Sequence, residues 1–449
     1  MPGSKEGKNI VIIGGGIIGC TSAYYLTHHP QFDPLLHNVT LIEATKIAGG
    51  ASGKAGGLLT SWAYPANIVQ LSFDLHEQLA EEHDGAHRWG YRRVRCGQLT
   101  ATALDDRMPK HESWSNASIL LGKWRRGDRT GVKPSVLPSD LDWFAAETAK
   151  AYEEIADEKT TAQVHPLQFT NEMARLSEEA GAKIVLGMVT NINCTVPSDM
   201  TNAKGNEDAV TTAPLLSFAG PTQKVVSVTY TDKKSGETKT IPADTIVLAA
   251  GPWTPTLLPD VPMASLRAHS VTIRPKRPIS AYCLFTEITL PDHTQPTTDA
   301  TKPPRGQASA STAPVTRILS PEFYARPNNE VYICGQGDVD APLPASSDLV
   351  EVSSAACAEL VAAASAVSDV LRDGIITGRR ACYLPTMDVG GSGGPLIGET
   401  DVKGMILAAG HSCWGILNAP ATGKVVSELI LDGEVRCADV ANLDPKKIL

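Results

Sequence analysis

The sequence predicts an α/β protein in which a domain with a parallel β-sheet is interleaved with a second domain built on an antiparallel sheet and helices. Three observations support this fold class. A short apolar strand near the N-terminus runs into a glycine-rich turn and a helix. Two later apolar strands, one central and one near the C-terminus, also end in glycines. Longer strand-like runs lie between these segments, so each domain draws on pieces that are distant in sequence.

The first segment, residues 9–43, has the pattern of a Rossmann-type β-α-β unit. Residues 9–13 (NIVII) are almost wholly apolar, as expected of a strand that is covered on both faces. Residues 14–19 (GGGIIG) match G-x-G-x-x-G and open a helix, and residues 38–42 form a second strand that ends in Glu43. This context around the glycines predicts a dinucleotide site.

Each glycine of the motif has a separate role. Gly14 makes the tight turn, Gly16 lets the backbone approach a pyrophosphate, and Gly19 permits close contact between helix and strand. The N–H groups and positive dipole end of the helix favour the phosphates. Glu43 can accept hydrogen bonds from ribose hydroxyls, and its charge would repel the 2′-phosphate of NADP.

Three further segments complete the predicted cofactor domain. Residues 49–58 (GGASGKAGGL) look like a P-loop but lack its glycine at Ala48 and its Ser or Thr at Ala55. Their small side chains instead let the backbone run along a flat ligand. Residues 245–253 and 405–424 are strands that break into Ala-Gly-Pro and Ala-Gly-His, and the second continues as a helix.

The predicted domains are discontinuous. Strand-like runs at 92–103, 270–288 and 324–334 suggest an antiparallel sheet, and helices are expected at 167–180 and 349–371. A Thr-, Pro- and Ser-rich stretch at 294–313 is expected to be a mobile surface loop. The expected boundaries are 1–90, 160–255 and 376–449 for the dinucleotide-binding domain, and 91–159 and 256–375 for the second, substrate domain.

Composition excludes several classes of function. The 449 residues carry a net charge of −9, which argues against partners such as nucleic acid or an anionic membrane surface. Nine cysteines occur without a C-x-x-C pair, so neither a disulfide framework nor a metal site is predicted, and a reducing compartment is favoured. No apolar stretch approaches the roughly 20 residues of a membrane span. We expect an intracellular, cytoplasmic protein that does not insert into membranes.

The ordered motifs resemble the FAD-dependent D-amino acid oxidase superfamily, which includes glycine, sarcosine and fructosyl amino acid oxidases. The resemblance rests on the N-terminal fingerprint, the loop at 49–58, VLAAGPW at 247–253 and AAGHSCWGILNAPATG at 408–423. Within this superfamily the sequence looks most similar to fungal FAD-dependent oxidoreductases, one of which is linked to endosomal trafficking. The resemblance implies an FAD cofactor, a small-molecule substrate and a link to endosomes through unidentified trafficking partners.

The resemblance also implies which residues contact FAD. A helix that starts near Ile416 would in addition aim its positive end at the flavin ring and favour the reduced, anionic form. The residues expected along the cofactor are Gly14, Gly16, Ile17, Ile18, Glu43, Ala44, Ala51, Ser52, Gly56, Gly57, Leu58, Val189, Ala249, Gly251, Trp253, Gly410, Gly415 and Ile416.

The substrate side departs from the family pattern. Glycine-oxidase-like members carry an arginine that clamps the substrate carboxylate in the segment entering the last cofactor strand, and Tyr383 occupies that position here. A tyrosine donates one hydrogen bond and has no charge. Arg380 or Arg379 is an alternative carboxylate-binding residue, although alternation along a strand puts Arg380 and Tyr383 on opposite faces. Two solvated arginines are the structural alternative.

Other candidates near the substrate remain open. Cys382 lies one residue out of register with the cysteine that binds flavin covalently in sarcosine- and fructosyl-type oxidases, so we expect non-covalent FAD and a buried thiol. Cys413 replaces a second arginine of the glycine-oxidase-like pattern. His269 could reach the flavin or make a structural hydrogen bond. Trp62 could form a wall of the substrate pocket or pack in the core.

The leading functional hypothesis is oxidation of a C–N bond in a small amine or modified amino acid, by hydride transfer to flavin N5. The catalytic residues are not identified by the sequence; the candidates are Tyr383, Arg380 and His269. One alternative is an NAD-dependent dehydrogenase that shares only the glycine fingerprint. The other is an FAD-binding protein with a mainly structural or trafficking role.

Overall fold

The predicted β-α-β unit forms the centre of the first sheet. In the computed structural model, which describes residues 7–104, 136–195, 210–211, 223–291, 316–387 and 394–449, β1 (Lys8–Ile13) pairs in parallel with β2 (His37–Glu43) and β12 (Thr245–Leu248). The full strand order is β11-β10-β8-β2-β1-β12-β20-β19, with β9 paired to β8. The remaining strands are β8 (Lys183–Thr195), β9 (Val210–Thr211), β10 (Lys224–Asp232), β11 (Thr238–Pro242), β19 (Leu396–Glu399) and β20 (Met405–Ala409).

Four helices gather beside this sheet. α1 (Ile17–Thr27) packs against α8 (Gly415–Leu431) and α4 (Pro166–Glu179), and α2 (Ala66–Glu82) packs against α8. Alternate residues of β1 are buried in different clusters: Ile10 and Ile12 lie with the helices, whereas Val11 and Ile13 lie in the core of the opposite face. The central strand is thus covered on both faces, as its apolar run predicts.

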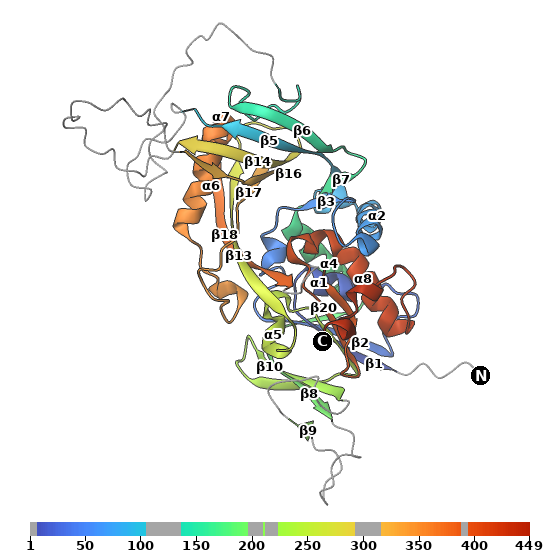
Figure 1. Cartoon of the computed structure of the whole chain (residues 1–449). Coiled ribbons are helices and arrows are strands. Elements are labelled where there is room, and N and C mark those ends of the chain that lie inside the picture. The colour runs from blue at the N-terminus through green and yellow to red at the C-terminus, as the bar shows by residue number, and fades with distance from the viewer. Residues whose placement is uncertain (1–6, 105–135, 196–209, 212–222, 292–315, 388–393) are drawn as a thin grey trace, which may run out of the picture.

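The second sheet is mainly antiparallel and belongs to the substrate domain. Its order is β18-β13-β17-β16-β14-β5-β6, with β15 paired to β14. Its strands are β5 (Arg95–Thr102), β6 (Ala149–Ala156), β13 (Met263–Arg274), β14 (Tyr282–Pro291), β15 (Thr316–Leu319), β16 (Glu322–Arg326), β17 (Glu330–Cys334) and β18 (Ile375–Met387). Helix α6 (Ser354–Val367) covers one face, and Figure 1 shows the first domain on the other side of the sheet.

Short elements connect the two domains. A three-stranded sheet, β3-β7-β4, joins β3 (Leu58–Thr60) to β7 (Thr161–Gln163) and β4 (Arg92–Arg93). The remaining elements are the short helices α3 (Gly85–Arg88), α5 (Thr254–Leu257) and α7 (Asp369–Arg372) and the 3-10 turns η1 (Ala51–Gly53), η5 (Gly251–Trp253), η6 (Ser347–Leu349), η7 (Ser412–Trp414), η8 (Ala441–Leu443) and η9 (Pro445–Lys447).

The predicted fold class is confirmed, but several predicted elements have different limits. The run 270–288, whose sequence is interrupted at Pro275 and Pro278, is two strands, and β13 begins earlier, at Met263, while β14 ends later, at Pro291. The run 324–334 is a hairpin of β16 and β17, and helix 349–371 divides into α6 and α7 at Ser368, whose hydroxyl caps the second helix. The proposed domain boundaries stay a prediction. The expected loop 294–313 lies outside the described residues.

The described residues contain no helix that is both long and apolar enough to cross a membrane.

Candidate functional site: a flavin cradle and its substrate face

The N-terminus of α1 has the features of a phosphate site. Gly14 has φ +112°, and a Cβ atom there would lie 2.3 Å from the carbonyl oxygen of Ala249, so only glycine fits. Gly16 precedes the helix without a side-chain cap, and the first-turn N–H groups have no acceptor within the helix. The N–H of Ile17 donates to Ser52 Oγ at 2.9 Å. Ile18, in the same turn, presents a further N–H, so this end fits an anionic ligand.

Glu43 lies at the carboxyl end of β2, beside this turn. Its Oε2 accepts from the N–H of Gly15 at 2.8 Å, and its Oε1 accepts from the N–H of Thr45 at 2.8 Å. The carboxylate is therefore held by the backbone of the glycine turn on one side and by the residue after Ala44 on the other. Oε1 also accepts from the hydroxyl of Thr45 and the N–H of Lys46, whereas Oε2 has one donor, so Oε2 can still accept a hydrogen bond from a ribose hydroxyl.

Val189 lies inside a strand rather than after one. The parallel pairing of β2 with β8 ends at Glu43 and Leu186, while β8 continues to Thr195 by pairing with β10. The sequence pattern indicates a strand only at residues 183–186, with Val189 after it, because the extension depends on a partner about 40 residues away, which local pattern does not reveal. Val189 follows the last residue paired with β2 by three positions, at the same end of the sheet as Glu43.

The small-residue loop 49–58, which we call the cofactor loop, passes between the two domains. It contains η1, which includes Ala51 and Ser52, and continues through Gly56 and Gly57 to Leu58 at the start of β3. A Cβ atom on Gly56 would lie 2.3 Å from the ring of Tyr324 on the antiparallel sheet. Arg326 from the same sheet donates to the carbonyl oxygens of Ala55 and Gly56. The loop is thus fixed against the substrate domain by its backbone.

Two other turns face the same region. Ala249 and Gly251 lead into η5, where the indole N–H of Trp253 donates to the carbonyl of Pro344 at 2.7 Å. Gly410 follows β20 and precedes η7, after which Gly415 and Ile416 open α8.

Helix α8 begins without a side-chain cap, so its positive end is available to a ligand. His76 of α2 donates its Nε2–H to the carbonyls of Ile416 and Leu417, at 3.0 and 3.1 Å, and fixes this turn. Burial lowers the pKa of His76 to about 4, which keeps the ring neutral.

Strand β18 brings these parts together, because it packs against η1, η5 and η7 at once. This strand holds the candidate residues of the substrate site. Arg380 and Cys382 lie on the face of β18 that meets Lys54 of the cofactor loop. Both side chains interact electrostatically with the Lys54 ammonium group. Arg379 is exposed and Tyr383 is buried on the opposite face, toward the side of the sheet that α6 covers.

Tyr383 and His269 have partners away from the cofactor loop. The Tyr383 hydroxyl donates to the backbone carbonyls of Ala341 and Pro342, at 3.0 and 2.9 Å. His269 Nε2 accepts from the N–H of Ser353 at 2.9 Å, and its Nδ1 lies 3.4 Å from Asp338 Oδ2. Burial lowers the pKa of His269. The structure therefore places both side chains in contacts that hold the 338–353 segment against the sheet.

The two candidate cysteines differ in exposure. Cys382 is buried, and burial raises its pKa to about 11, so the thiolate that a covalent flavin link requires is scarce. Cys413 in η7 is exposed and shares a side-chain hydrogen bond with Tyr64. Cys413, like Tyr383, lies at a position where the glycine-oxidase-like pattern has an arginine.

Strand register aligns a row of side chains on the face that meets the cofactor loop. Ser270 pairs with Arg380 on one side and with Cys334 on the other; Cys334 pairs with Glu322, and Glu322 with Phe285. Directly paired residues share a face, and the strands of Arg380 and Glu322 are three steps apart, about 14 Å between backbones. The row thus has a cation at one end and an acid near the other.

Sequence reasoning missed Glu322, since it lies in an ordinary-looking strand and only the pairing of four strands places it in this row. It also missed Lys54, which lies in the segment 49–58 that resembles a P-loop without matching it. The signal that could have identified Lys54 is its place among glycines and alanines, because a lysine that is partly buried there needs a partner for its charge.

The cationic end of the row has more positive than negative charge. Arg326 is buried, pairs with Glu330 at 3.2 Å and lies 4.5 Å from the centre of the Tyr332 ring. Arg380 acts electrostatically on both Arg326 and Lys54. Burial lowers the pKa of Lys54. Within the described part of the chain, neither Lys54 nor Arg380 makes an ion pair, so this end fits an anionic group of a ligand.

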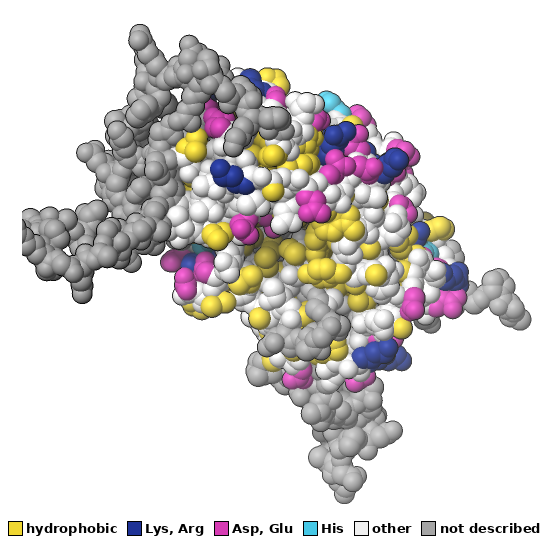
Figure 2. Space-filling view, turned by 45° about the horizontal axis from the view of Figure 1, so that its top comes forward, with side chains coloured by type: hydrophobic (Ala, Val, Ile, Leu, Met, Phe, Trp, Pro, Cys, Tyr) yellow, Lys and Arg dark blue, Asp and Glu magenta, His cyan; other side chains and the backbone are white. Residues whose placement is uncertain are grey.

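The opposite end of the row is lined by aromatic rings. Trp62 lies 6.5 Å from Phe285 and 6.1 Å from Trp414, and Tyr64 lies 6.1 Å from Trp414, centre to centre. Trp62 and Tyr64 remain 42% and 46% exposed. Figure 2 shows hydrophobic side chains gathered around a hollow in the middle of one face of the molecule. Trp62, predicted as a pocket wall, thus lies in a ring cluster that is open to solvent.

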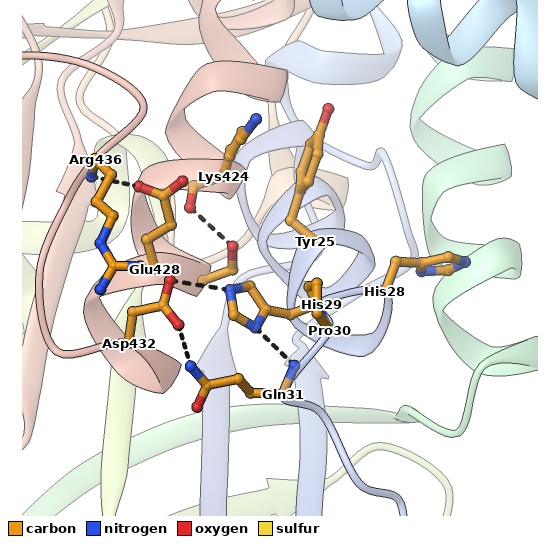
Figure 3. A pocket seen from close by; sticks show the side chains of 10 residues that line it. Tyr25, His28, His29, Pro30, Gln31, Lys424, Glu428, Asp432 and Arg436 are labelled. Carbon is orange, nitrogen blue, oxygen red and sulfur yellow. Dashed lines mark hydrogen bonds and ion pairs between the residues drawn. The ribbon is translucent and has the colours of Figure 1, made fainter.

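A separate pocket of about 520 Å³ lies at the other end of α1 and α8. Figure 3 shows His29 there between Gln31 and Asp432, with Glu428 and Arg436 beside them. Its charged groups are largely paired with one another or with backbone: Asp432 accepts from Gln31, and Glu428 accepts from the N–H of Arg436 at 2.7 Å. Ligands of parallel sheets bind at the carboxyl ends of the strands, so this pocket is distinct from the cofactor site.

Comparisons with known proteins identify the family of this chain. The family described as FAD dependent oxidoreductase, DAO, matches residues 9–429. TDA3 of Saccharomyces cerevisiae, which carries an oxidoreductase designation, is 35% identical over 99% of this chain and 95% of its own length. Glycine oxidase from Geobacillus kaustophilus shares the fold at a TM-score of 0.61 and 17% identity, over 98% of this chain and 100% of that chain.

Iminodiacetate oxidase from Chelativorans sp. BNC1 also has the same fold, with a TM-score of 0.61 and 15% identity over 97% of this chain and 99% of that one. The family match overturns the NAD-dependent alternative, because the family is defined by FAD. The chain belongs to the DAO family of FAD-dependent oxidoreductases.

Proposed function

We propose that this enzyme oxidises a C–N bond of a small amine or modified amino acid that carries a carboxylate. The observation that carries this proposal is the row on the antiparallel sheet, with Arg380 at one end and Glu322 near the other. A zwitterionic substrate matches this distribution of charge. The names of the structural neighbours, glycine oxidase and iminodiacetate oxidase, are consistent with such a substrate.

Arg380 takes the role of carboxylate-binding residue in place of the arginine that Tyr383 replaces. Its side chain lies on the face of β18 that meets the cofactor loop, and its guanidinium has the planar fork that binds a carboxylate through two hydrogen bonds. Lys54 supplies a second positive charge from the loop itself. Tyr383 supports this arrangement indirectly, by holding the 341–342 backbone.

Bound FAD would supply the hydride acceptor of the reaction, at flavin N5. The contributions of this chain are binding and orientation. The N-terminus of α1 and Glu43 would hold the adenosine diphosphate part of FAD, and the N-terminus of α8 would favour negative charge on the reduced ring. Arg380 orients the substrate, and the aromatic rings around Trp62 offer it an apolar surface.

We infer non-covalent attachment of FAD, since the Cys382 thiol is buried with a raised pKa. A cytoplasmic location is part of the proposal and is supported by the nine cysteines, all of which are free thiols. An endosomal association rests on the family resemblance alone. Fluorescence microscopy of the tagged protein, with an endosomal marker in the second channel, tests both locations.

The experiment that tests the reaction is anaerobic mixing of the yellow holoprotein with a panel of amines, amino acids and glycated amino acids. At least one carboxylate-bearing amine is expected to bleach the visible absorption band of the bound flavin. Dithionite serves as the control that the bound flavin can be reduced. If dithionite bleaches the flavin and no compound of the panel does, the enzymatic proposal fails and a structural or trafficking role gains support.

A further inference from the structure

A strap, which we define as residues 335–353, joins β17 to α6 and contains the turn η6. Its first part is fixed to the antiparallel sheet. The backbones of Asp338 and Arg267 exchange two hydrogen bonds, at 2.7 and 2.9 Å, and their side chains form an ion pair at 2.9 Å. Its middle part is held at Pro344, whose carbonyl accepts from the indole N–H of Trp253 at 2.7 Å. The strap thus reaches from the sheet to η5 of the cofactor domain.

The tip of the strap meets the segment that follows Glu43. Ser347 Oγ lies 2.7 Å from Thr45 Oγ1, and both side chains are buried. Thr45 Oγ1 lies 2.9 Å from Glu43 Oε1. A Cβ atom on Gly49 would lie 2.8 Å from Ser347 Oγ and 2.7 Å from Thr45 Oγ1, so the glycine leaves room for this contact. A chain of three polar groups therefore leads from the strap to the predicted ribose-binding carboxylate.

The direction of the hydrogen bonds in this chain follows from the number of protons. A carboxylate only accepts, so the single proton of the Thr45 hydroxyl points to Glu43 Oε1. The Thr45 oxygen is then the acceptor for the hydroxyl of Ser347. Oε1 also accepts from the N–H groups of Thr45 and Lys46, whereas Oε2 has one donor, the N–H of Gly15. Ser347 thus fixes the hydroxyl that holds Oε1, and Oε2 remains available to a ligand.

Charge complementarity favours the same docking of the strap. Asp348, at the tip, lies within electrostatic range of Lys46 and Lys233 of the cofactor domain. A hydrogen bond from Ser346 lowers the pKa of Asp348, and the charges of the two lysines act in the same direction. Lys233 also donates to the backbone carbonyl of Thr45. The tip therefore carries a negative charge to a part of the cofactor domain that is positive.

We propose that Ser347 is a positioning residue for FAD, which acts through Thr45 to hold the Glu43 carboxylate toward the adenosine ribose. Docking of the strap and binding of FAD are then coupled, because both depend on the same orientation of Glu43. Such coupling is reciprocal: the factor by which the docked strap strengthens FAD binding is the factor by which FAD stabilises the docked strap. The inference rests on the proposed function only for the contact of Glu43 with the ribose.

A double-mutant cycle tests this role, with titration of the full-length apoprotein by FAD and flavin fluorescence as the readout. Ser347→Ala removes the donor to Thr45 and should raise the Kd for FAD about three- to tenfold. Thr45→Ala should raise it similarly, whereas Thr45→Ser keeps the hydroxyl and should match the wild type. In a Glu43→Gln background Ser347→Ala should have little further effect, because the carboxylate that it positions is gone.

Ser365→Ala is the matched control for the loss of a buried serine hydroxyl. Ser365 is buried to a similar extent and donates to the carbonyl of Val361 at 2.8 Å within α6. This variant should bind FAD as the wild type does. An unchanged Kd in Ser347→Ala or in Glu43→Gln would overturn the proposal. So would an effect of Ser347→Ala that is as large in the Glu43→Gln background as in the wild type.

Hydrogen–deuterium exchange measures the same coupling from the side of the strap. FAD should slow the exchange of backbone amides at residues 346–352 in the wild type and in Ser365→Ala, and should slow it less in Ser347→Ala. A general loss of stability would not remove the effect of FAD on this one segment. The same slowing by FAD in Ser347→Ala and in the wild type would contradict the coupling.

None of these measurements requires turnover, so their outcomes are separate from those of the proposed reaction. A protein in which the strap and FAD are coupled, but whose flavin no amine bleaches, retains this role of Ser347 and loses the oxidase proposal. A protein whose flavin is bleached by an amine, but in which FAD and the strap are not coupled, retains the oxidase proposal and loses the role of Ser347.

Discussion

At the scale of single residues, the substrate face depends on which way each side chain of β18 points. Arg380 and Cys382 face the cofactor loop, whereas Arg379 and Tyr383 face away from it. The sequence predicts this alternation for Arg380 and Tyr383, because side chains alternate along a strand. It does not reveal which of the two faces meets the flavin, since that depends on where α6 packs.

Cys382, also on β18, determines how the flavin is attached. Because burial raises the pKa of its thiol to about 11, we expect the flavin to remain non-covalent. Acid precipitation should release FAD into the supernatant from the wild type and from Cys382→Ser alike. Yellow pellets from the wild type and colourless ones from Cys382→Ser would show instead that this thiol is the covalent anchor.

At the scale of elements, the turn between β1 and α1 is the most constrained part of the cofactor site. In Gly14→Ala the new methyl group would meet the Ala249 carbonyl at 2.3 Å in a backbone conformation that L-residues avoid. We expect a loss of bound FAD and destabilisation by roughly 1–3 kcal/mol or more. The measurements are the ratio of flavin absorbance to protein and the thermal midpoint.

Gly236→Ala is the matched control for this change. Gly236 also has positive φ, +72°, but a Cβ atom there would have no neighbour within 4 Å. The control should lose a little stability and keep its FAD. Equal losses of FAD in the two variants would mean that backbone strain in general, rather than the shape of this turn, governs cofactor binding.

Buried histidines should make stability depend on pH. Burial lowers the pKa of His411 to about 3 and that of His76 to about 4, both below the ordinary value near 6.5. Between those values the unfolded chain binds protons that the folded protein does not. The free energy of unfolding should therefore be fully maintained above about pH 6.5 and fall as pH drops toward 4, by up to about 1.4 kcal/mol per pH unit for each histidine.

The comparison of His411→Gln with His87→Gln tests this slope. His411 Nε2 bonds to Thr422 Oγ1 at 3.0 Å, a contact that glutamine can keep, while the His87 side chain is 88% exposed. Denaturant unfolding at pH 7 and pH 5 should show a smaller loss of stability in His411→Gln than in the wild type or in His87→Gln. Equal losses of stability in all three proteins would show that His411 does not contribute to the pH dependence.

The elements of the cofactor domain were largely predictable from sequence. The row of side chains from Arg380 to Phe285 was not. The apolar run of β1, the glycine motif and Glu43 are local signals, and the structure has them where the pattern places them. The row from Arg380 to Phe285 is assembled from five strands, whose register is set by packing and not by any one segment. Local pattern cannot contain that information.

At the scale of the whole molecule, one buried arginine joins the two domains. Arg326 of the antiparallel sheet is 2% exposed and donates to the backbone of Ala55 and Gly56 in the cofactor loop, while it pairs with Glu330. Arg326→Met leaves two carbonyls and the Glu330 carboxylate without this partner. We expect destabilisation by about 3–5 kcal/mol and a loss of FAD.

Arg317→Met provides the comparison, because Arg317 pairs with Glu359 at 2.6 Å near the surface. A partly exposed pair contributes about 0–1 kcal/mol, so this variant should keep its FAD and nearly all its stability. Thermal unfolding with and without added FAD distinguishes the two. Similar small effects in both variants would mean that the contacts of Arg326 do not hold the loop.

The central claim is that Arg380, in the charged row on the antiparallel sheet, binds the substrate carboxylate. The most direct measurement is the rate of anaerobic flavin reduction against concentration, for a carboxylate-bearing substrate and for the amine that lacks the carboxylate. In Arg380→Met the half-saturating concentration of the carboxylate substrate should rise about tenfold to a hundredfold, with little change for the amine. Arg379→Met, on the opposite face, should match the wild type. If Arg380→Met also matches the wild type, or if both substrates are affected equally, Arg380 does not bind the carboxylate.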